Sequence, residues 1–358
     1  MAVVKPFRAV RYDEERAGPL AEVVAPPYDV IGPDERRELL ARSPHNVVHL
    51  TLPDSEEEAA LAWEEWLGSG VLATEADPGF WALEQDYVGP DGVSRTRTGL
   101  VGSLRLEPYE SGVVLPHERT HAGPKEGRLR LLRATGVQLE PIFLLYDGEP
   151  PFEVPARPAD VALEGTRLWR LEPGGIAETF ADRQLLIADG HHRYETALAH
   201  HAEQGTEESA WMPVVLVSTD DEGLTIFPTH RVFRDAKVLS SNGAGDEPER
   251  SLEHLTSLPY ERAAAVQVTA GGAAVVTGEP GQLDVQLVDR LGHEGIAYTP
   301  DWREAVRRVR EGEAGAAYLL RPTRIEDVFA AARRGDVMPQ KTTYFFPKLL
   351  SGLLFHPL

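Results

Sequence analysis

The segment 185–205 constrains the fold of this chain more than any other. It opens with the apolar run Leu185-Leu186-Ile187-Ala188, which is typical of a buried strand. Asp189-Gly190 ends that run, and apolar residues then recur at helical spacing from Tyr194 onward. The sequence therefore predicts a strand that passes through a glycine turn directly into a helix.

The residues of this turn are suited to bind an anion. A helix that follows a strand directly points its first free N–H groups at the turn, and the helix dipole adds partial positive charge there. Gly190 permits an unusual backbone angle or the close approach of a ligand. His191, His192 and Arg193 add hydrogen-bond donors, and Asp189 can take a hydroxyl group or a metal ion. A helix cap with surface histidines is the alternative, but it explains a single histidine better than this cluster of polar groups around a glycine.

The composition restricts the classes of function. A formal net charge of −21 opposes non-specific binding to DNA and adhesion to anionic membranes. Cysteine is absent, which excludes disulfides, thiolate nucleophiles and cysteine-bound metals. The first residues lack the apolar core of a signal peptide, and no run of about 18 apolar residues occurs. We therefore expect a cytoplasmic enzyme for a small-molecule substrate, a monomer or homodimer with no nucleic-acid and no membrane partner.

Proline and glycine divide the remaining sequence into many short elements. Helical patterns occupy 33–40, 126–134, 301–311 and 325–334, and Ser55 with Glu58 predicts a capping box for another helix. Strand patterns occupy 46–50, 80–87, 96–104, 141–146, 213–218 and 224–228, with a strand-rich section at 264–288. The mixture predicts an α+β (mixed α/β) fold. Its expected parts are an N-terminal region at 1–105, a core at 106–238 and a C-terminal α+β subdomain at 239–358.

A literal zinc-protease string occurs at His117-Glu118-Arg119-Thr120-His121. Pro116 precedes it and Ala122-Gly123-Pro124 follows it, so barely one helical turn is available to bring the two histidines onto one face. We therefore favour a turn after a short strand at 113–115, which leaves the Glu118 carboxylate in a loop as a general base. A solvated loop acid and a zinc hydrolase remain the alternatives.

Further polar residues are candidates for the same site. Lys125 and Arg128 follow Glu118 closely and are available to phosphate oxygens. Lys341-Thr342-Thr343 resembles a phosphate-contacting string, although no G-x-x-x-x-G-K-[ST] motif occurs, so a nucleotide would be bound without a Walker A loop. This string lies in Met338–Lys348, whose aromatics and lysines predict a docked segment. Residues for which substrate binding and a structural turn are open alternatives are Arg11, Tyr28, Asp29, His117 and His230.

Several strings resemble a known family. PFRAVRYD, APPYDVI, NVVHL, RTRTG, LPHERT, PIFLLYD, ADGHHRYETAL, FPTHR and MPQKTTYFFPK follow one another along nearly the whole chain. Together they are similar to the bacterial and archaeal domain-of-unknown-function 1015 family, whose name implies no activity. A strand followed by DGHHR and a helix, downstream of a PHE turn, is also similar to the ParB/sulfiredoxin-like superfamily, and within it to the free-serine kinases.

The second resemblance implies a ParB/sulfiredoxin-like core with N-terminal and C-terminal α+β additions. It implies a kinase that uses ATP or ADP with Mg²⁺ to phosphorylate a small hydroxyl metabolite, with free L-serine as the favoured acceptor. Glu118, Asp189 and His192 would be catalytic, and Asp189 would also hold Mg²⁺. The residues that would bind the nucleotide phosphates are Gly190, His191, Arg193, Lys125, Arg128, Lys341, Thr342 and Thr343. For Lys125, Arg128 and Lys341, binding of the substrate carboxylate is the alternative. A phosphatase or other hydrolase with the same anion loop, and a ParB-like nucleotide-binding regulatory protein, are the alternatives.

Overall fold

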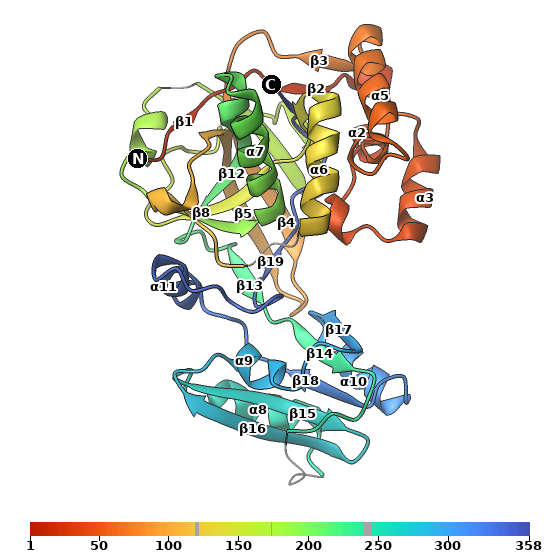
Figure 1. Cartoon of the computed structure of the whole chain (residues 1–358), viewed down its shortest axis with the longest axis vertical. Helices are drawn as coiled ribbons and strands as arrows, with labels where there is room; N and C mark the ends of the chain where they lie inside the picture. Colours follow the sequence, from red (N-terminus) through yellow and green to blue (C-terminus); the bar gives the residue numbers. More distant parts are fainter. Residues whose placement is uncertain (119–121, 173, 240–244) are drawn as a thin grey trace.

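A nine-stranded mixed sheet forms the centre of the larger part of the molecule (Figure 1). The computed structural model describes residues 1–118, 122–172, 174–239 and 245–358. The strand order is β6-β11-β8-β12-β5-β4-β10-β9, and β1 pairs with β5 beside this path. The pairs β6/β11 and β8/β12 are parallel and the other pairs are antiparallel. The strand bounds are β1 Val4–Lys5, β4 Phe80–Val88, β5 Ser94–Arg105, β6 Val114–Leu115, β8 Ile142–Tyr146, β9 Val161–Leu163, β10 Thr166–Leu171, β11 Leu185–Asp189 and β12 Trp211–Ser218.

Both faces of this sheet are buried. In β4, Phe80 and Ala82 belong to one apolar cluster, whereas Trp81 and Leu83 belong to the other, as the alternation of side chains along a strand requires. Because both clusters must be covered, the central strands are apolar at nearly every position. This explains why apolar runs in the sequence locate these strands.

Three long helices pack beside one another in this part of the molecule. Helices α6 (Ala122–Thr135) and α7 (His191–Gln204) lie side by side, and α5 (Glu56–Ser69) packs against α6 (Figure 1). The hydroxyl of Ser55 accepts a hydrogen bond from the Glu58 N–H at 3.2 Å, which confirms the predicted N-terminal cap of α5. The shorter helices of this part are α1 Glu14–Ala17, α2 Leu20–Val23, α3 Pro33–Arg42, α4 Val48–Thr51, η1 Tyr28–Val30, η2 Tyr109–Ser111, η3 Ala177–Phe180 and η4 Glu208–Ala210.

A five-stranded antiparallel sheet forms the second part, with strand order β16-β15-β18-β14-β17. Its strands are β14 His230–Phe233, β15 Arg262–Thr269, β16 Gly272–Pro280, β17 Ile296–Thr299 and β18 Ala316–Leu319. Helices α8 (Pro248–Ser257) and α10 (Trp302–Arg310) contribute to an apolar cluster on one face, and α9 (Asp284–Asp289) contributes to a cluster on the other.

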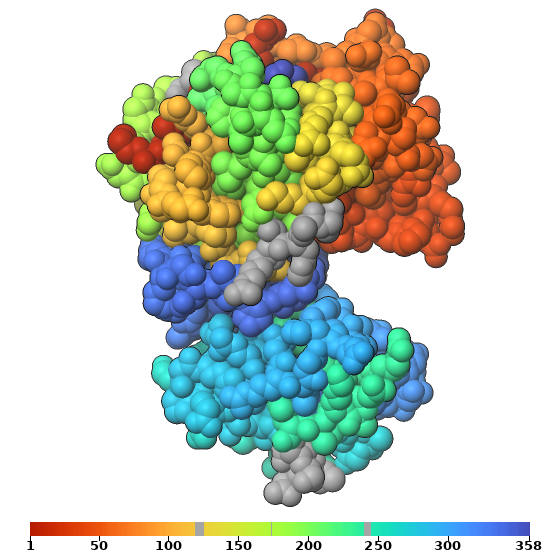
Figure 2. All heavy atoms as spheres, in the orientation of Figure 1, coloured from red at the N-terminus to blue at the C-terminus, as the bar shows by residue number. Residues whose placement is uncertain are grey.

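The chain then returns to the large sheet. After α11 (Ile325–Arg333), strand β19 (Tyr344–Phe346) pairs with β13 (Thr225–Phe227), and β20 (His356–Pro357) pairs with β7 (Val137–Gln138). A further two-stranded sheet joins β2 (Val10–Tyr12) to β3 (Leu72–Thr74). Figure 2 shows the dark-blue C-terminal residues between the upper and lower parts of the molecule, beside an indentation on the right.

The predicted α+β class is confirmed, but two local predictions are wrong. Residues 46–50 contain helix α4, because the side-chain oxygen Oδ1 of Asn46 accepts from the Val48 N–H at 3.1 Å and turns the chain. The section 264–288 is strand-rich as predicted, with α9 after its two strands. His230 does not close the strand at 224–228, since β13 ends at Phe227 and His230 starts β14 in the other sheet. No helix of the described residues is long and apolar enough to cross a membrane.

Candidate active site

The predicted strand–turn–helix segment is confirmed and forms one wall of a cleft. Strand β11 ends at Asp189, Gly190 follows with a φ of 98°, and α7 begins at His191. A Cβ atom on Gly190 would lie 2.6 Å from Cγ2 of Ile142, so both the backbone angle and the packing require glycine here. The N-terminus of α7 therefore meets the cleft with its free N–H groups.

The cleft has a volume of about 390 Å³, within the range of small-molecule sites. Four segments that are distant in sequence line it: η1, the residues that follow β6, the β11–α7 turn and the C-terminal residues before β20. The lining residues are Tyr28, Asp29, Val30, Glu118, Ala188, Asp189, Gly190, His191, His192, Arg193, Gln340, Lys341, Thr343, Tyr344, Phe345 and Lys348.

Asp189 is bound by two cationic side chains. The Lys348 ammonium donates to Oδ1 at 2.7 Å, and the Arg193 guanidinium donates to Oδ2 at 2.9 Å. Burial alone would raise the pKa of Asp189, but the charges of Lys348 and Arg193 outweigh it and lower that pKa to about 2. Asp189 is therefore an ionised acceptor that organises the two cations, and each of its oxygens accepts one hydrogen bond from a cation.

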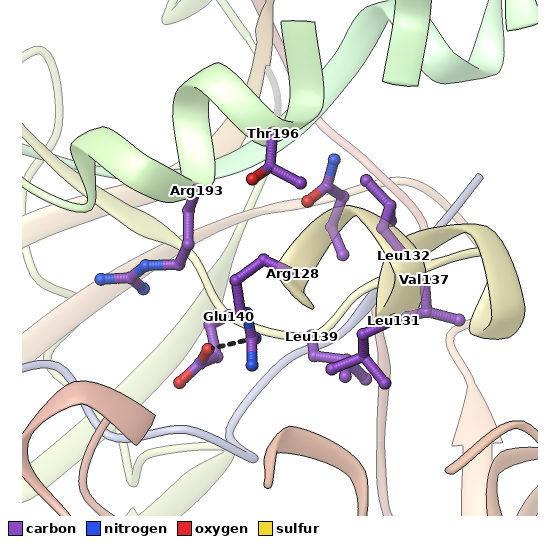
Figure 3. Close-up of a pocket in the computed structure, with 9 residues that line it drawn as sticks. Arg128, Leu131, Leu132, Val137, Leu139, Glu140, Arg193 and Thr196 are labelled. Atoms are coloured by element: carbon purple, nitrogen blue, oxygen red, sulfur yellow. Dashed lines mark hydrogen bonds and ion pairs between the residues drawn. The ribbon is translucent and has the colours of Figure 1, made fainter. Parts of the chain in front are cut away.

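Arg193 is buried and has a second partner. Its guanidinium also donates to the carbonyl oxygen of Pro141, at the start of the adjacent strand. The side chain lines the cleft and, behind it, a small cavity of about 30 Å³ between α6 and α7. Figure 3 shows Arg193 and Thr196 on α7 facing this cavity, with the ion pair of Arg128 and Glu140 on its opposite side.

Glu118 lines the cleft beside the turn, in the segment that follows β6, the parallel neighbour of β11. Burial raises the pKa of its carboxyl group above the ordinary 4.5, and the Lys341 ammonium and a hydrogen bond from the Lys341 backbone oppose that rise. A carboxylate that is partly removed from water and faces a ligand cleft is a stronger base than an exposed one.

The contacts of His117 do not fit the role of a zinc ligand. Its ring is buried, with Nδ1 at 2.7 Å from the carbonyl oxygen of Ile187 and Nε2 at 2.9 Å from the hydroxyl of Thr343. Burial lowers the pKa of His117 to about 4, so the ring is neutral near physiological pH. Both ring nitrogens are occupied, and His121 lies outside the described residues. Among the residues that are described, no group of three or more His, Asp or Glu side chains is arranged to hold a metal ion.

We call Met338–Lys348 the strap, because it crosses from the second sheet to the large sheet over this site. Its first residue donates its N–H to the His117 carbonyl oxygen at 2.9 Å, beside Glu118. At its other end the buried Arg97 donates to the Pro347 carbonyl oxygen at 2.7 Å, and Gln85 donates to that of Lys348 at 3.4 Å. The strap is therefore attached at one end beside Glu118 and at the other end to strands β4 and β5 of the large sheet.

Four of the predicted phosphate- or substrate-binding residues lie outside the cleft and have structural partners. Lys125 pairs with Glu195 at 3.1 Å, and Arg11 pairs with Glu75 at 2.6 Å. Arg128 pairs with the buried Glu140 at 2.8 Å and lies over the ring of Tyr28. The ring of His230 is buried and accepts the Leu320 N–H at 3.1 Å.

Of the two predicted threonines of the strap, one lines the cleft and the other has a structural role. Thr343 lines the cleft, whereas Thr342 is buried and donates to the Pro339 carbonyl oxygen. Lys348 and Tyr344 line the site without having been singled out from the sequence. The lysines and aromatic residues of the strap predict that this segment is docked, but no neighbouring residue indicates that Lys348 pairs with Asp189.

No curated protein sequence matches the chain. A free serine kinase in complex with AMP is similar in structure, with 18% identity, a TM-score of 0.39, and coverage of 65% of this chain and 83% of that chain. A conserved hypothetical protein from Pyrococcus furiosus has 20% identity and a TM-score of 0.38 over 65% of this chain and 87% of that chain. SbnI with a C-terminal truncation, from Staphylococcus aureus, has 11% identity and a TM-score of 0.39 over 69% and 85%.

The family model described as "Protein of unknown function (DUF1015)" matches residues 4–254, which is more than half of the sequence. The chain therefore belongs to the DUF1015 family.

Proposed function

We propose that this protein is a small-molecule kinase, which transfers the terminal phosphoryl group of ATP or ADP to the hydroxyl group of a small metabolite. The observation that carries the proposal is that the desolvated Glu118 carboxylate and the N-terminus of α7 line one cleft. Free L-serine, which would become O-phosphoserine, is the favoured acceptor because of the sequence resemblance to the free-serine kinases.

Phosphoryl transfer needs a site for the phosphates, a base and correct placement, and no protein nucleophile. In the proposed reaction the acceptor oxygen attacks the terminal phosphorus, and Glu118 takes the hydroxyl proton. The bond from that phosphorus to the bridging oxygen breaks, and the shortened nucleotide leaves with the electron pair. The raised pKa of Glu118 favours proton capture.

The anion-binding wall would carry the phosphates. The free N–H groups at the start of α7 and its dipole favour negative charge at the turn. Asp189 holds Lys348 and Arg193 at the same wall, so we assign it a positioning role. His192 also lines this wall, and its predicted catalytic role stays a proposal.

Mg²⁺ supplied with the nucleotide would contribute neutralisation of the phosphate charge. Asp189 is the side chain that would hold it in the prediction from the sequence, and in the structure its two oxygens are bonded to Arg193 and Lys348. We therefore derive no step through a protein-bound ion.

The test is incubation with ATP or ADP, Mg²⁺ and a panel of hydroxyl amino acids, with phosphorylated product read by mass spectrometry. Product with L-serine is expected. Nucleotide binding without phosphorylated product from any acceptor would refute the kinase. Phosphate release at the same rate with and without acceptor would instead indicate a hydrolase.

A further inference from the structure

Lys341 differs from the other cations of the cleft. Lys348 is bound to Asp189, and Arg193 is bound to Asp189 and to a backbone carbonyl. Lys341 is exposed and lines the cleft, and its ammonium has no ion pair or hydrogen bond with any residue in the described ranges. Its charge is therefore available to a ligand.

The backbone of Lys341 is fixed in an unfavourable conformation. Its φ is 58°, and within the described residues it is the one non-glycine residue with a positive φ. Contacts on both sides hold it there: the buried Arg231 donates to the Gln340 carbonyl oxygen at 3.2 Å, and Thr323 donates to that of Thr342 at 3.0 Å. A glycine would adopt this backbone angle without strain, whereas a lysine adopts it at a cost in stability. Residues with such backbone strain cluster at functional sites, which supports a functional role for the Lys341 side chain.

Lys341 is also on the side of the proposed base. Its backbone is hydrogen-bonded to Glu118, and among the side-chain charges near that carboxylate its ammonium has the largest effect in lowering the pKa. The strap residue three positions earlier, Met338, is bonded to His117 next to the same carboxylate. The phosphates are assigned to the α7 turn, so a cation beside Glu118 lies where the acceptor must place its hydroxyl group.

We infer that Lys341 selects the acceptor by binding an anionic group, a carboxylate in the simplest case, that the acceptor carries close to its reacting hydroxyl; this rests on the proposed kinase activity. The substrate class is then the hydroxy acids, including 2-amino-3-hydroxy acids, and it excludes neutral alcohols and amides. An anion on the acceptor also compensates the ammonium, so Glu118 keeps its strength as a base when the correct acceptor is bound. Of the two roles that the sequence leaves open for Lys341, binding phosphate and binding the acceptor carboxylate, this inference selects the second.

The inference is tested by calorimetry in the presence of ADP, with L-serine against L-serinamide and glycerate against glycerol. These pairs keep the hydroxyl group and remove the carboxylate. The unmodified protein should prefer the acid of a pair by about 30-fold or more. Lys341→Met should abolish that preference and leave ADP affinity unchanged, whereas Lys341→Arg should retain it. If the Met variant folds poorly, Lys341→Gly replaces it, because glycine adopts a φ of 58° without strain and also removes the ammonium. It should likewise abolish the preference for the acid.

Equal binding of acid and neutral partner by the unmodified protein would overturn the inference. So would a Lys341→Met variant that loses ADP affinity but keeps its preference for the acid, because Lys341 would then bind phosphate. Failure of the kinase itself is seen separately, as preferential binding of the acid with no phosphorylated product.

Discussion

Replacing Asp189 by asparagine tests whether this carboxylate organises the cations of the cleft. Asparagine keeps the size of the side chain but removes the charge that faces Lys348 and Arg193. Both cations would then remain largely buried without the carboxylate to which they are bonded, and removal of one partner of a buried ion pair is strongly destabilising.

The magnitude follows from the pKa of Asp189. Its fall from an ordinary 3.8 to about 2 corresponds to about 2 kcal/mol of stabilisation of the ionised folded form. The folded pKa is depressed, so this stabilisation is fully present above pH 3.8 and is lost as the pH falls toward 2. Asp189→Asn should therefore lower the free energy of unfolding by about 2 kcal/mol at neutral pH, and about 1 kcal/mol of that difference should disappear by pH 3.

The assay is urea unfolding of both proteins at several pH values between neutral and pH 3. Asp220→Asn, at an exposed acid, is the control and should change the free energy of unfolding by no more than about 0.5 kcal/mol. A difference between Asp189→Asn and the unmodified protein that stays constant across this range would refute the reasoning. A loss below about 1 kcal/mol at neutral pH would do so as well.

Three further changes probe the cleft. Gly190→Ala should lower the free energy of unfolding by about 3 kcal/mol in denaturant titration, because the new Cβ would lie 2.6 Å from Ile142. The control Gly136→Ala has a φ of 63° and no atom within 4 Å of the new Cβ, so it should lower that free energy by about 1 kcal/mol. Equal losses for the two variants would contradict the packing argument. Glu118→Gln should lower turnover by about 100-fold or more while calorimetry shows unchanged nucleotide affinity. In the unmodified enzyme kcat/KM should fall as the pH drops through a pKa above 4.5, and persistence of this acid limb in the Gln variant would exclude Glu118 as the base. Arg193→Ala should weaken nucleotide binding by at least about tenfold, and unchanged affinity would remove Arg193 from the phosphate wall.

The parts of the fold that can be predicted from the sequence have local causes. The β11–α7 segment joins a buried strand to an amphipathic helix at Gly190, and each of these features appears in neighbouring residues. The cap of α5 is local for the same reason, since Ser55 bonds the N–H of Glu58 three residues later. By contrast, α4 appears as a strand because the apolar residues after Asn46 are too few to show a helical period.

The candidate site can be predicted only in part. Glu118 and the Asp189–Arg193 turn follow recognisable strands, and both line the cleft. Lys348 meets Asp189 across 159 residues of sequence, so no local pattern indicates the pair. Lys125 shows the opposite error: the sequence assigns it to the phosphates, but it lies on α6, one residue before the predicted helix 126–134, and pairs with Glu195 on α7.

The attachment of the strap has a consequence for the order of folding. The bond from Arg97 to Pro347 spans 250 residues and that from Lys348 to Asp189 spans 159, so these contacts depend on chain closure over long distances. The large sheet can pair most of its strands before the second sheet delivers the strap. A molecule that occupies the cleft contacts both, and by mass action it draws the docked form from the partly folded population. Ligand binding and the final stage of folding are thus linked in one equilibrium.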